Sequence, residues 1–198
     1  MLKFNFRSVA ALCVATAALF VAPPSQAGDR TLFGDFGVVG KNADRWEARL
    51  GIASYDTGVF SHKAFDGVVV NGEILAPSPD FLYGLGSPRP YVGFDAAIAD
   101  DPVHFFYTGL NWETYFTDRL YLSNSLGGAI HTADKLEHPD GDYKALGCRA
   151  LFHLGIGVGY DLTRDVTAQL YADHFSNADL CDKNNGAESA GIRVGYRF

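Results

Sequence analysis

The chain has 198 residues, of which 47% are hydrophobic and 20% are charged, and its formal net charge is −7. This acidic balance argues against a nucleic acid as partner, because binding to phosphates requires a basic surface. The length suits one domain, and we expect residues 28–198 to form it after removal of a leader.

The leader covers residues 1–27. It begins with two basic residues, continues as a mostly apolar run from Val9 to Ala22, and ends in Ser-Gln-Ala, with cleavage expected after Ala27. This pattern is typical of a secretory signal peptide, and its apolar run is too short for a membrane-spanning helix. We therefore expect an exported protein that has no transmembrane helix.

The rest of the chain alternates between apolar and small or polar side chains. Such alternation predicts strands, because successive side chains of an extended strand point to opposite faces. In residues 146–161, for example, one face is almost wholly apolar and the other carries four glycines. Eight strands are expected, over residues 45–56, 64–76, 88–99, 103–113, 118–131, 146–161, 166–177 and 187–198.

Eight is an even number of strands, as a closed bacterial outer-membrane barrel requires. Alternation alone would also fit a soluble sandwich whose apolar face lies inside. Strand length, short turns that alternate with longer loops, and small residues on the second face favour the membrane barrel. We predict an all-β fold, an eight-stranded antiparallel transmembrane β-barrel in the outer membrane of a Gram-negative bacterium.

In this barrel the apolar face contacts lipid and the polar face lines the lumen. The residues expected to face outward are Trp46, Leu50, Ile52, Val92, Phe94, Ile98, Leu110 and Trp112. The residues expected to face inward are Glu47, Arg49, Glu73, Asp95, Asn111, Glu113, Arg149, Arg193 and Arg197. With both chain ends in the periplasm, the extracellular loops would be residues 57–63, 100–102, 132–145 and 178–186.

Two segments fit this scheme less well. The link at residues 77–87 would be an unusually long periplasmic turn. Asn71-Gly72 is a hairpin signal, and an alternative is that the second strand folds into two short ones, which would change the strand count.

Cys148 and Cys181 remain after the leader is removed. In an oxidising compartment they predict one disulfide, which would join the last extracellular loop to the sixth strand. Their spacing matches no zinc motif, and residues 182–186 lack the spacing of an EF-hand. No metal or organic cofactor is expected.

His174 and Ser176 lie near the end of the seventh strand, and Glu188 follows at the start of the eighth. Alternation puts all three on the apolar face at the extracellular rim. A serine hydroxyl becomes a nucleophile when a histidine accepts its proton and a carboxylate orients that histidine. We assign these roles to Ser176, His174 and Glu188. The pairing expected for the two strands brings Ser176 near Glu188 and Val166 beside Phe198.

Without the carboxylate, His174 and Ser176 would be interpreted as an ordinary polar rim. Asn177 and Asn184 are candidate oxyanion donors or supports of the site, although isolated asparagines are typical of turns. His131 ends the fifth strand at the same rim, where a solvated side chain is the simplest interpretation. Four cations are candidate contacts for lipid phosphates: Lys135, Lys144, Arg149 and Lys183.

Stretches near the C-terminus resemble the lipid A 3-O-deacylases, the PagL family. They are residues 174–178, the positions Asn184, Gly186 and Glu188, and residues 191–198. Similarity is looser upstream, at residues 109–112 and 126–131. One departure from the family is Asp179, at a position where some relatives have a small residue.

The resemblance implies an eight-stranded outer-membrane barrel whose active site faces lipid. It implies His174, Ser176 and Glu188 as the catalytic triad, with Asn177 and Asn184 near the site. It also implies the substrate: lipid A of lipopolysaccharide, from which the ester-linked 3-hydroxyacyl chain at the 3-position would be hydrolysed.

Two other functions stay open at this point. The first is a noncatalytic small outer-membrane barrel, either an adhesin or a structural protein. The second is an outer-membrane esterase that acts on other lipid acyl esters. The sequence also leaves open the acyl-chain preference and the oligomeric state, including a homodimer.

Overall fold

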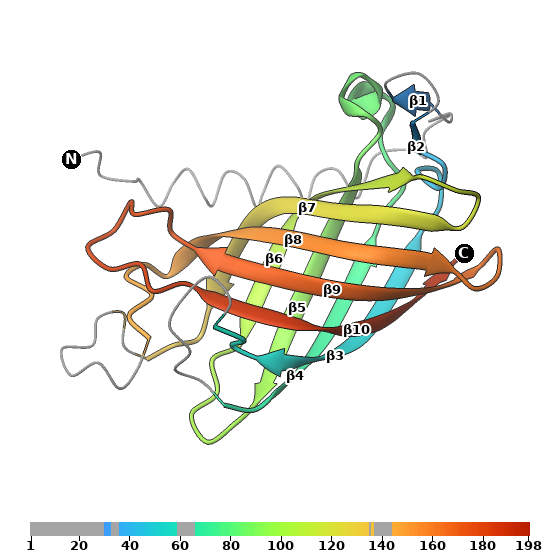
Figure 1. Cartoon of the computed structure of the whole chain (residues 1–198). Coiled ribbons are helices and arrows are strands. Elements are labelled where there is room, and N and C mark those ends of the chain that lie inside the picture. The colour runs from blue at the N-terminus through green and yellow to red at the C-terminus, as the bar shows by residue number, and fades with distance from the viewer. Residues whose placement is uncertain (1–29, 33–35, 59–65, 135, 137–143) are drawn as a thin grey trace.

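The computed structural model describes residues 30–32, 36–58, 66–134, 136 and 144–198. Eight of its strands form the wall of a barrel (Figure 1). They are β3 (Glu47–Tyr55), β4 (Val68–Leu75), β5 (Arg89–Ile98), β6 (Phe105–Tyr115), β7 (Leu120–His131), β8 (Ala150–Asp161), β9 (Val166–Ser176) and β10 (Ala187–Arg197). The expected signal peptide and its cleavage site lie outside the described residues.

Every strand of the wall pairs antiparallel with its neighbours in the sequence, and β10 pairs with β3 to close the barrel. The closing register places Arg197 opposite Glu47 and Ser189 opposite Tyr55. The prediction of a closed eight-stranded barrel is therefore confirmed, and the sandwich alternative is wrong. The hairpin alternative is also wrong, because Asn71 and Gly72 lie within β4 and pair with β5 on one side and β3 on the other.

No helix in the described part of the chain is long and apolar enough to cross a membrane.

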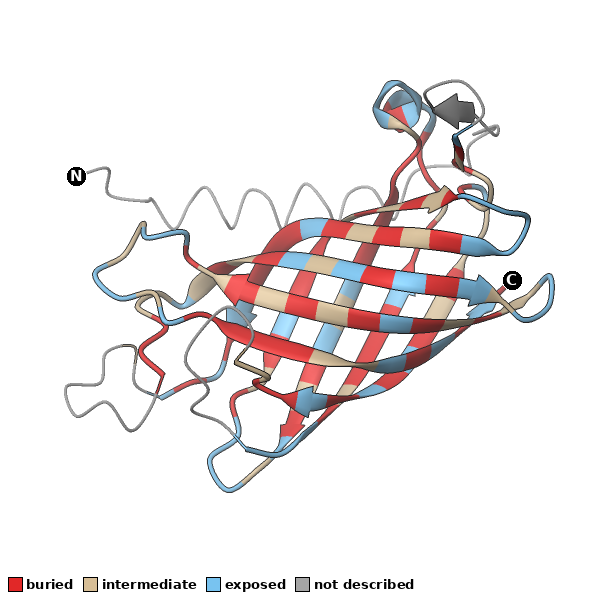
Figure 2. Cartoon of the chain, in the orientation of Figure 1, coloured by how far each residue is buried: buried red, intermediate tan, exposed pale blue. Residues whose placement is uncertain are grey.

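Burial alternates along the strands, so bands of exposed and buried residues run around the wall (Figure 2). Leu50, Ile52, Val92, Phe94 and Ile98 are exposed on the outside, as predicted. The inward residues that are buried, also as predicted, are Glu47, Arg49, Glu73, Asp95, Asn111, Glu113, Arg193 and Arg197. A soluble protein would hide the first set and expose the second, so this inversion identifies lipid as the solvent of the outer wall.

Arg149 contradicts the inward prediction, because it is exposed. The sixth strand of the wall, β8, begins at Ala150 rather than at residue 146, so Arg149 precedes the regular alternation. Its guanidinium donates to the backbone oxygens of His131, at 3.0 Å, and Ala133, at 2.6 Å. Arg149 therefore fastens the rim between β7 and β8.

Side chains fill the lumen in two zones. One zone is ionic: Arg49 donates to Glu47 at 2.7 Å and to Glu113 at 2.6 Å, and Arg193 lies 2.8 Å from Glu73. These pairs satisfy charges that are removed from water. The other zone is aromatic, where Phe105 stacks on Phe175 with ring centroids 4.3 Å apart. The packed lumen leaves the outer wall and the rims as the surfaces that a large substrate can reach.

The end of the barrel with the short turns carries an addition that the sequence did not predict. A hairpin of β1 (Arg30–Leu32) and β2 (Gly37–Val39) joins β6 through the pairs Val38–Tyr115 and Val39–Thr114. The link between β4 and β5 contains a short 3-10 helix, η1 (Asp80–Leu85). The unusually long periplasmic turn is thus partly ordered. By the usual arrangement of bacterial barrels, short turns mark the periplasmic end and long loops the extracellular end.

Candidate active site

The site is built on the terminal hairpin β9–β10. Glu188 pairs directly with His174, and the ladder between these strands ends at the pair Ala187–Phe175. Ser176 lies beyond that pair and is opposite Phe152 of β8. The predicted register was therefore wrong by two residues, because the connecting loop begins earlier than expected. The shift places the carboxylate beside the histidine rather than beside the serine.

His174 and Glu188 form a hydrogen-bonded pair on the outer wall. The distance from His174 Nδ1 to Glu188 Oε1 is 3.1 Å, and the exposed fractions of the two side chains are 27% and 3%. The backbone oxygen of Glu188 accepts a hydrogen bond from the Thr57 N–H at 3.1 Å. A buried carboxylate thus fixes one ring nitrogen while the ring itself stays partly accessible.

An apolar depression of about 560 Å³ lies beside this pair, across β8, β9 and β10. Its lining includes Leu154 and Ile156 of β8, His174 and Glu188. Small side chains form its floor, since Ala172 of β9 pairs directly with Ala190 of β10. A hydrocarbon chain in the membrane could reach the histidine from this side without entering the lumen.

Ser176 is half-buried and follows His174 at the next outward position of β9. Among the described residues, no hydrogen bond joins its hydroxyl to His174. Two residues along a strand advance about 6.6–6.8 Å, so rotation of two leaning side chains is needed to bring them into contact. Nucleophile–base hydrogen bonds are often looser before substrate binds.

Asn177 and Asn184 hold the loop that follows Ser176. The Asn177 N–H donates to Asn184 Oδ1 at 2.9 Å, and the Asn177 amide donates to the backbone oxygens of Leu146, at 2.8 Å, and Lys183, at 2.6 Å. The Asn184 amide donates to Asp179 Oδ1 at 3.0 Å. The Asn184 amide is therefore engaged within the loop itself, whereas the Asn177 amide also ties the loop to Leu146, which precedes β8.

The same loop turns sharply after Asn177. Ala178 and Asp179 both have positive φ, of 53° and 58°, and the Leu180 N–H donates to the Asn177 oxygen at 3.1 Å. Two consecutive left-handed residues without glycine are unfavourable and persist only when surrounding contacts enforce them. The loop beside Ser176 is thus held in a definite shape by its asparagine contacts.

A buried ion pair that the sequence did not predict lies behind Glu188. Lys144 and Asp56 are both almost fully buried and in direct contact, and the Glu188 N–H donates to Asp56 Oδ1 at 3.5 Å. The pair connects the first and third extracellular loops with β10. The suggestion that Lys144 contacts lipid phosphates was therefore wrong. Lys183 is exposed, and Lys135 lies outside the described residues.

His131 makes two hydrogen bonds through its ring. Its Nε2 donates to the backbone oxygen of Cys148 at 2.7 Å, and its Nδ1 accepts from the Ala133 N–H at 3.2 Å. The ring is buried rather than solvated, so the interpretation as a solvated rim histidine was wrong. With both nitrogens engaged, His131 supports the rim.

Cys148 and Cys181 are joined as a disulfide in the structure, with Cα atoms 6.1 Å apart. The bond ties the β9–β10 loop to the start of β8. Among the described residues, no group of three or more histidine, cysteine, aspartate or glutamate side chains is arranged to hold a metal ion.

A second histidine–carboxylate pair lies on the inner side of the same strands. His153 Nε2 lies 3.0 Å from Asp173 Oδ1, its Nδ1 accepts from the Tyr91 hydroxyl at 2.6 Å, and the histidine side chain is fully buried. Neither residue of this pair was predicted from the sequence to be functional. A signal in the sequence was available. Both residues occupy inward positions of the alternation, and Asp173 directly precedes His174.

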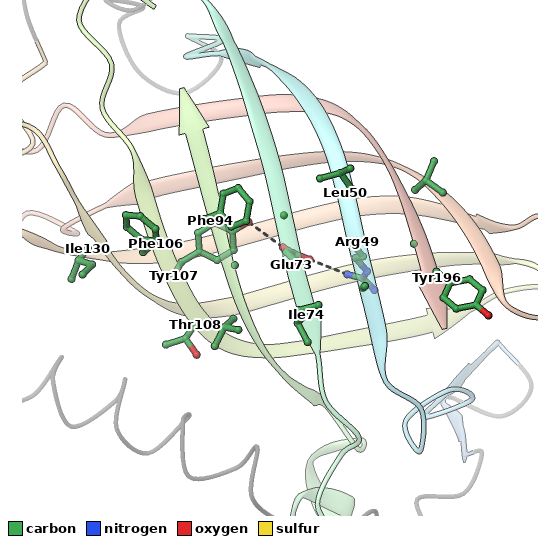
Figure 3. Close-up of a pocket in the computed structure, with 16 residues that line it drawn as sticks. Arg49, Leu50, Glu73, Ile74, Phe94, Phe106, Tyr107, Thr108, Ile130 and Tyr196 are labelled. Carbon is green, nitrogen blue, oxygen red and sulfur yellow. Dashed lines mark hydrogen bonds and ion pairs between the residues drawn. The ribbon is translucent and has the colours of Figure 1, made fainter. Parts of the chain in front are cut away.

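A larger depression, of about 900 Å³, lies elsewhere on the outer wall, where Leu50, Ile74, Phe94 and Phe106 surround it (Figure 3). The described residues that line it include no histidine, serine or cysteine. Its Thr108 hydroxyl donates to the Tyr91 backbone oxygen at 2.7 Å. Size therefore does not identify the candidate site, because of these two depressions only the smaller is lined by a histidine.

Comparisons with known proteins agree with the barrel fold. The chain is similar to the crystal structure of the outer membrane enzyme PagL, with 15% identity, a TM-score of 0.55, and coverage of 76% of this chain and 98% of that one. It is also similar to the N-terminal β-barrel domain of Pseudomonas aeruginosa OprF, with 13% identity, a TM-score of 0.52, and coverage of 78% and 97%. At these identities the two likenesses show the barrel fold alone.

No curated protein matches the chain. The model of a protein family, lipid A 3-O-deacylase (PagL), matches residues 102–197, which include β6 to β10 and all three proposed triad residues. The chain is an outer-membrane β-barrel, and its residues 102–197 are similar to the lipid A 3-O-deacylase (PagL) family.

Proposed function

We propose that the protein hydrolyses the ester that links a 3-hydroxyacyl chain to the 3-position of lipid A, with Ser176 as nucleophile, His174 as general base and Glu188 as the orienting carboxylate. The observation that carries this proposal is the His174–Glu188 pair on the outer wall, next to Ser176 and an apolar depression. The family supplies the substrate class. The barrel alone does not, because OprF has a similar barrel.

The roles follow from the hydrogen bond. Because Glu188 accepts from Nδ1–H of His174, the neutral ring presents Nε2 as the basic nitrogen. The buried carboxylate stabilises the imidazolium that forms when Nε2 takes the Ser176 proton. The low exposure of Glu188 strengthens the attraction between its carboxylate and the imidazolium, because water screens a buried pair less than a surface pair.

The reaction proceeds in two steps. Ser176 Oγ attacks the ester carbonyl carbon, and its proton passes to His174; the bond from that carbon to the sugar oxygen then breaks, and this oxygen takes the proton. The acyl chain is now esterified to Ser176. Water attacks the acyl-enzyme with His174 again as base, which releases the free hydroxy fatty acid and restores the serine.

Asn177 and Asn184 serve this mechanism by supporting the loop. Their amide groups hold the positive-φ turn at Ala178 and Asp179. The shape of this turn sets the orientation of the backbone N–H groups of the loop. Backbone N–H groups next to a nucleophile are suited to stabilise a developing oxyanion. In this proposal the asparagines act on catalysis through the shape of the turn.

Purified wild-type protein and the Ser176→Ala variant are each incubated in detergent micelles with lipid A, and loss of one hydroxyacyl chain is followed by mass spectrometry. Turnover by the wild type and none by the variant is expected. Equal turnover would refute the nucleophile assignment. Cleavage of phospholipid esters instead of lipid A by the wild type would refute the substrate assignment alone.

A further inference from the structure

The link between β4 and β5 presents apolar side chains away from the protein. In η1, the exposed fractions of Phe81 and Leu85 are 68% and 62%, and Tyr83 is also exposed, whereas Leu82 is buried at 6%. Clustered exposed apolar side chains mark a surface that contacts a membrane or a protein. The link is therefore more than a connection between two strands.

Hydrogen bonds hold this segment in place. The Ser78 N–H donates to the Ala43 oxygen at 2.6 Å, and the Ser87 N–H donates to the Leu82 oxygen at 3.2 Å. Gly86 ends the helix with a φ of 92°, a conformation that suits glycine. The exposed side chains thus stand on an ordered scaffold.

The scaffold is attached to the lipid-facing side of the wall. The indole N–H of Trp112, an outward residue of β6, donates to the Leu85 oxygen at 2.8 Å. A Cβ added to Gly86 would lie 3.6 Å from the Trp112 ring, so the end of the helix passes close to this side chain. Figure 1 shows η1 and the β1–β2 hairpin beside the wall, towards the end at which the C-terminus lies.

The attachment lies near the periplasmic end of the wall. Trp112 is three residues from the periplasmic end of β6 at Tyr115. Other large apolar side chains exposed at the same end are Phe36, Phe116, Tyr160, Leu162, Tyr196 and Phe198. Girdles of aromatic residues at this position mark the boundary between hydrocarbon and headgroups in outer-membrane barrels.

We propose that η1 is a membrane-interface anchor that inserts Phe81 and Leu85 into the periplasmic leaflet of the outer membrane. The occupant of this surface is phospholipid, because the apolar side chains continue the lipid-facing wall at Trp112. The anchor extends the contact of the barrel with that leaflet on the side of β4 to β6. It would set the depth and tilt of the barrel, and it acts at the opposite end from the proposed active site.

The test places a fluorescent reporter on the anchor. The variants Phe81→Trp and, as matched control, Asp118→Trp in the exposed turn between β6 and β7 are refolded into phosphatidylcholine vesicles. Their emission is compared with that of the parent, which contains Trp46 and Trp112. Two quenchers are used: lipids with brominated acyl chains, and iodide on both sides of the membrane.

The added emission of Phe81→Trp is expected to shift to the blue, to be quenched by the brominated chains, and to be several-fold less sensitive to iodide than that of Asp118→Trp. If Phe81→Trp does not refold, as judged by heat-modifiable electrophoretic mobility, Leu85→Trp takes its place. Equal iodide quenching in anchor and control variants would overturn the proposal. The protection of Phe81→Trp from iodide should persist at fewer than one chain per vesicle. Loss of this protection on dilution would also overturn the proposal, because a second copy of the chain would then cover η1.

Discussion

Two histidine–carboxylate pairs lie back to back on the last strands of the barrel, and they differ in access rather than in geometry. His174–Glu188 spans 3.1 Å on the outer wall, and His153–Asp173 spans 3.0 Å in the lumen. The outer pair lies next to an apolar depression and a serine. The inner pair is buried, and its histidine accepts a hydrogen bond from the Tyr91 hydroxyl. A short histidine–carboxylate distance therefore does not define an active site; a nucleophile and a path for substrate must accompany it.

The largest expected effect follows from removal of the outer base. His174→Ala should lower lipid A deacylation by about 10³-fold or more, because Ser176 then lacks its proton acceptor. The measurement is acyl release by mass spectrometry on protein whose folding is checked by electrophoretic mobility. Activity within a few-fold of wild type, in folded protein, would mean that the outer pair is an ordinary polar rim.

Glu188→Gln should have the next largest effect, a loss of about 10²–10⁴-fold. The amide keeps the size of the side chain but cannot stabilise the imidazolium, and its NH₂ group can favour the wrong tautomer of His174. The loss should appear in kcat, with KM nearly unchanged, because the Glu188 side chain is almost fully buried and acts through His174. A change confined to KM would instead assign Glu188 to substrate binding.

Lys144→Met tests the buried support behind the outer pair. Loss of one partner of a buried ion pair costs about 3–5 kcal/mol, and Asp56 would then lose its contact with the Lys144 ammonium beside the Glu188 backbone. The free energy of unfolding in urea should fall accordingly, and deacylation should fall several-fold. The control is Lys183→Met, an exposed lysine of the neighbouring loop, which should leave the free energy of unfolding unchanged. Equal effects of both substitutions would remove the special role of Lys144.

The smallest effect on activity is expected for the inner pair. His153→Gln can keep hydrogen bonds to Asp173 and Tyr91, so a loss of stability of about 1–2 kcal/mol is expected with activity within about threefold of wild type. Deacylation and urea unfolding are measured on the same preparation. A drop in activity as large as that of His174→Ala, without unfolding, would reverse the comparison between the two pairs.

The sequence was most informative about the wall, because lipid and lumen impose opposite chemistry on alternate residues. The neighbours Arg49 and Leu50 are enough to assign the inward and outward faces of β3. The same alternation predicted that His174, Ser176 and Glu188 share one face. Features set by contacts distant in the sequence were not predictable. Asp56 and Lys144 come from different loops, and the register of β9 with β10 depends on how Asn177 bonds outside the ladder.

The periplasmic link shows the same limit. Phe81 and Leu85 in residues 77–87 were unremarkable among prolines and glycines, and their meaning depends on Trp112 of β6, which is distant in the sequence. The predicted inward orientation of Arg149 was wrong for a local reason. The alternation was extended to residues that precede the first paired residue of β8. For Arg149 the hydrophobic pattern was correct, and the missing information was where the ladder of β8 begins.

The measurement that tests the central claim most directly is covalent labelling with a lipophilic fluorophosphonate, followed by peptide mass spectrometry. Attack by an activated serine displaces fluoride and leaves a phosphonyl group on its oxygen. The account predicts label on Ser176 in the wild type and in His153→Gln, and little or none in His174→Ala. Label on a different residue, undiminished label in His174→Ala, or loss of label only when the inner pair is changed would contradict it.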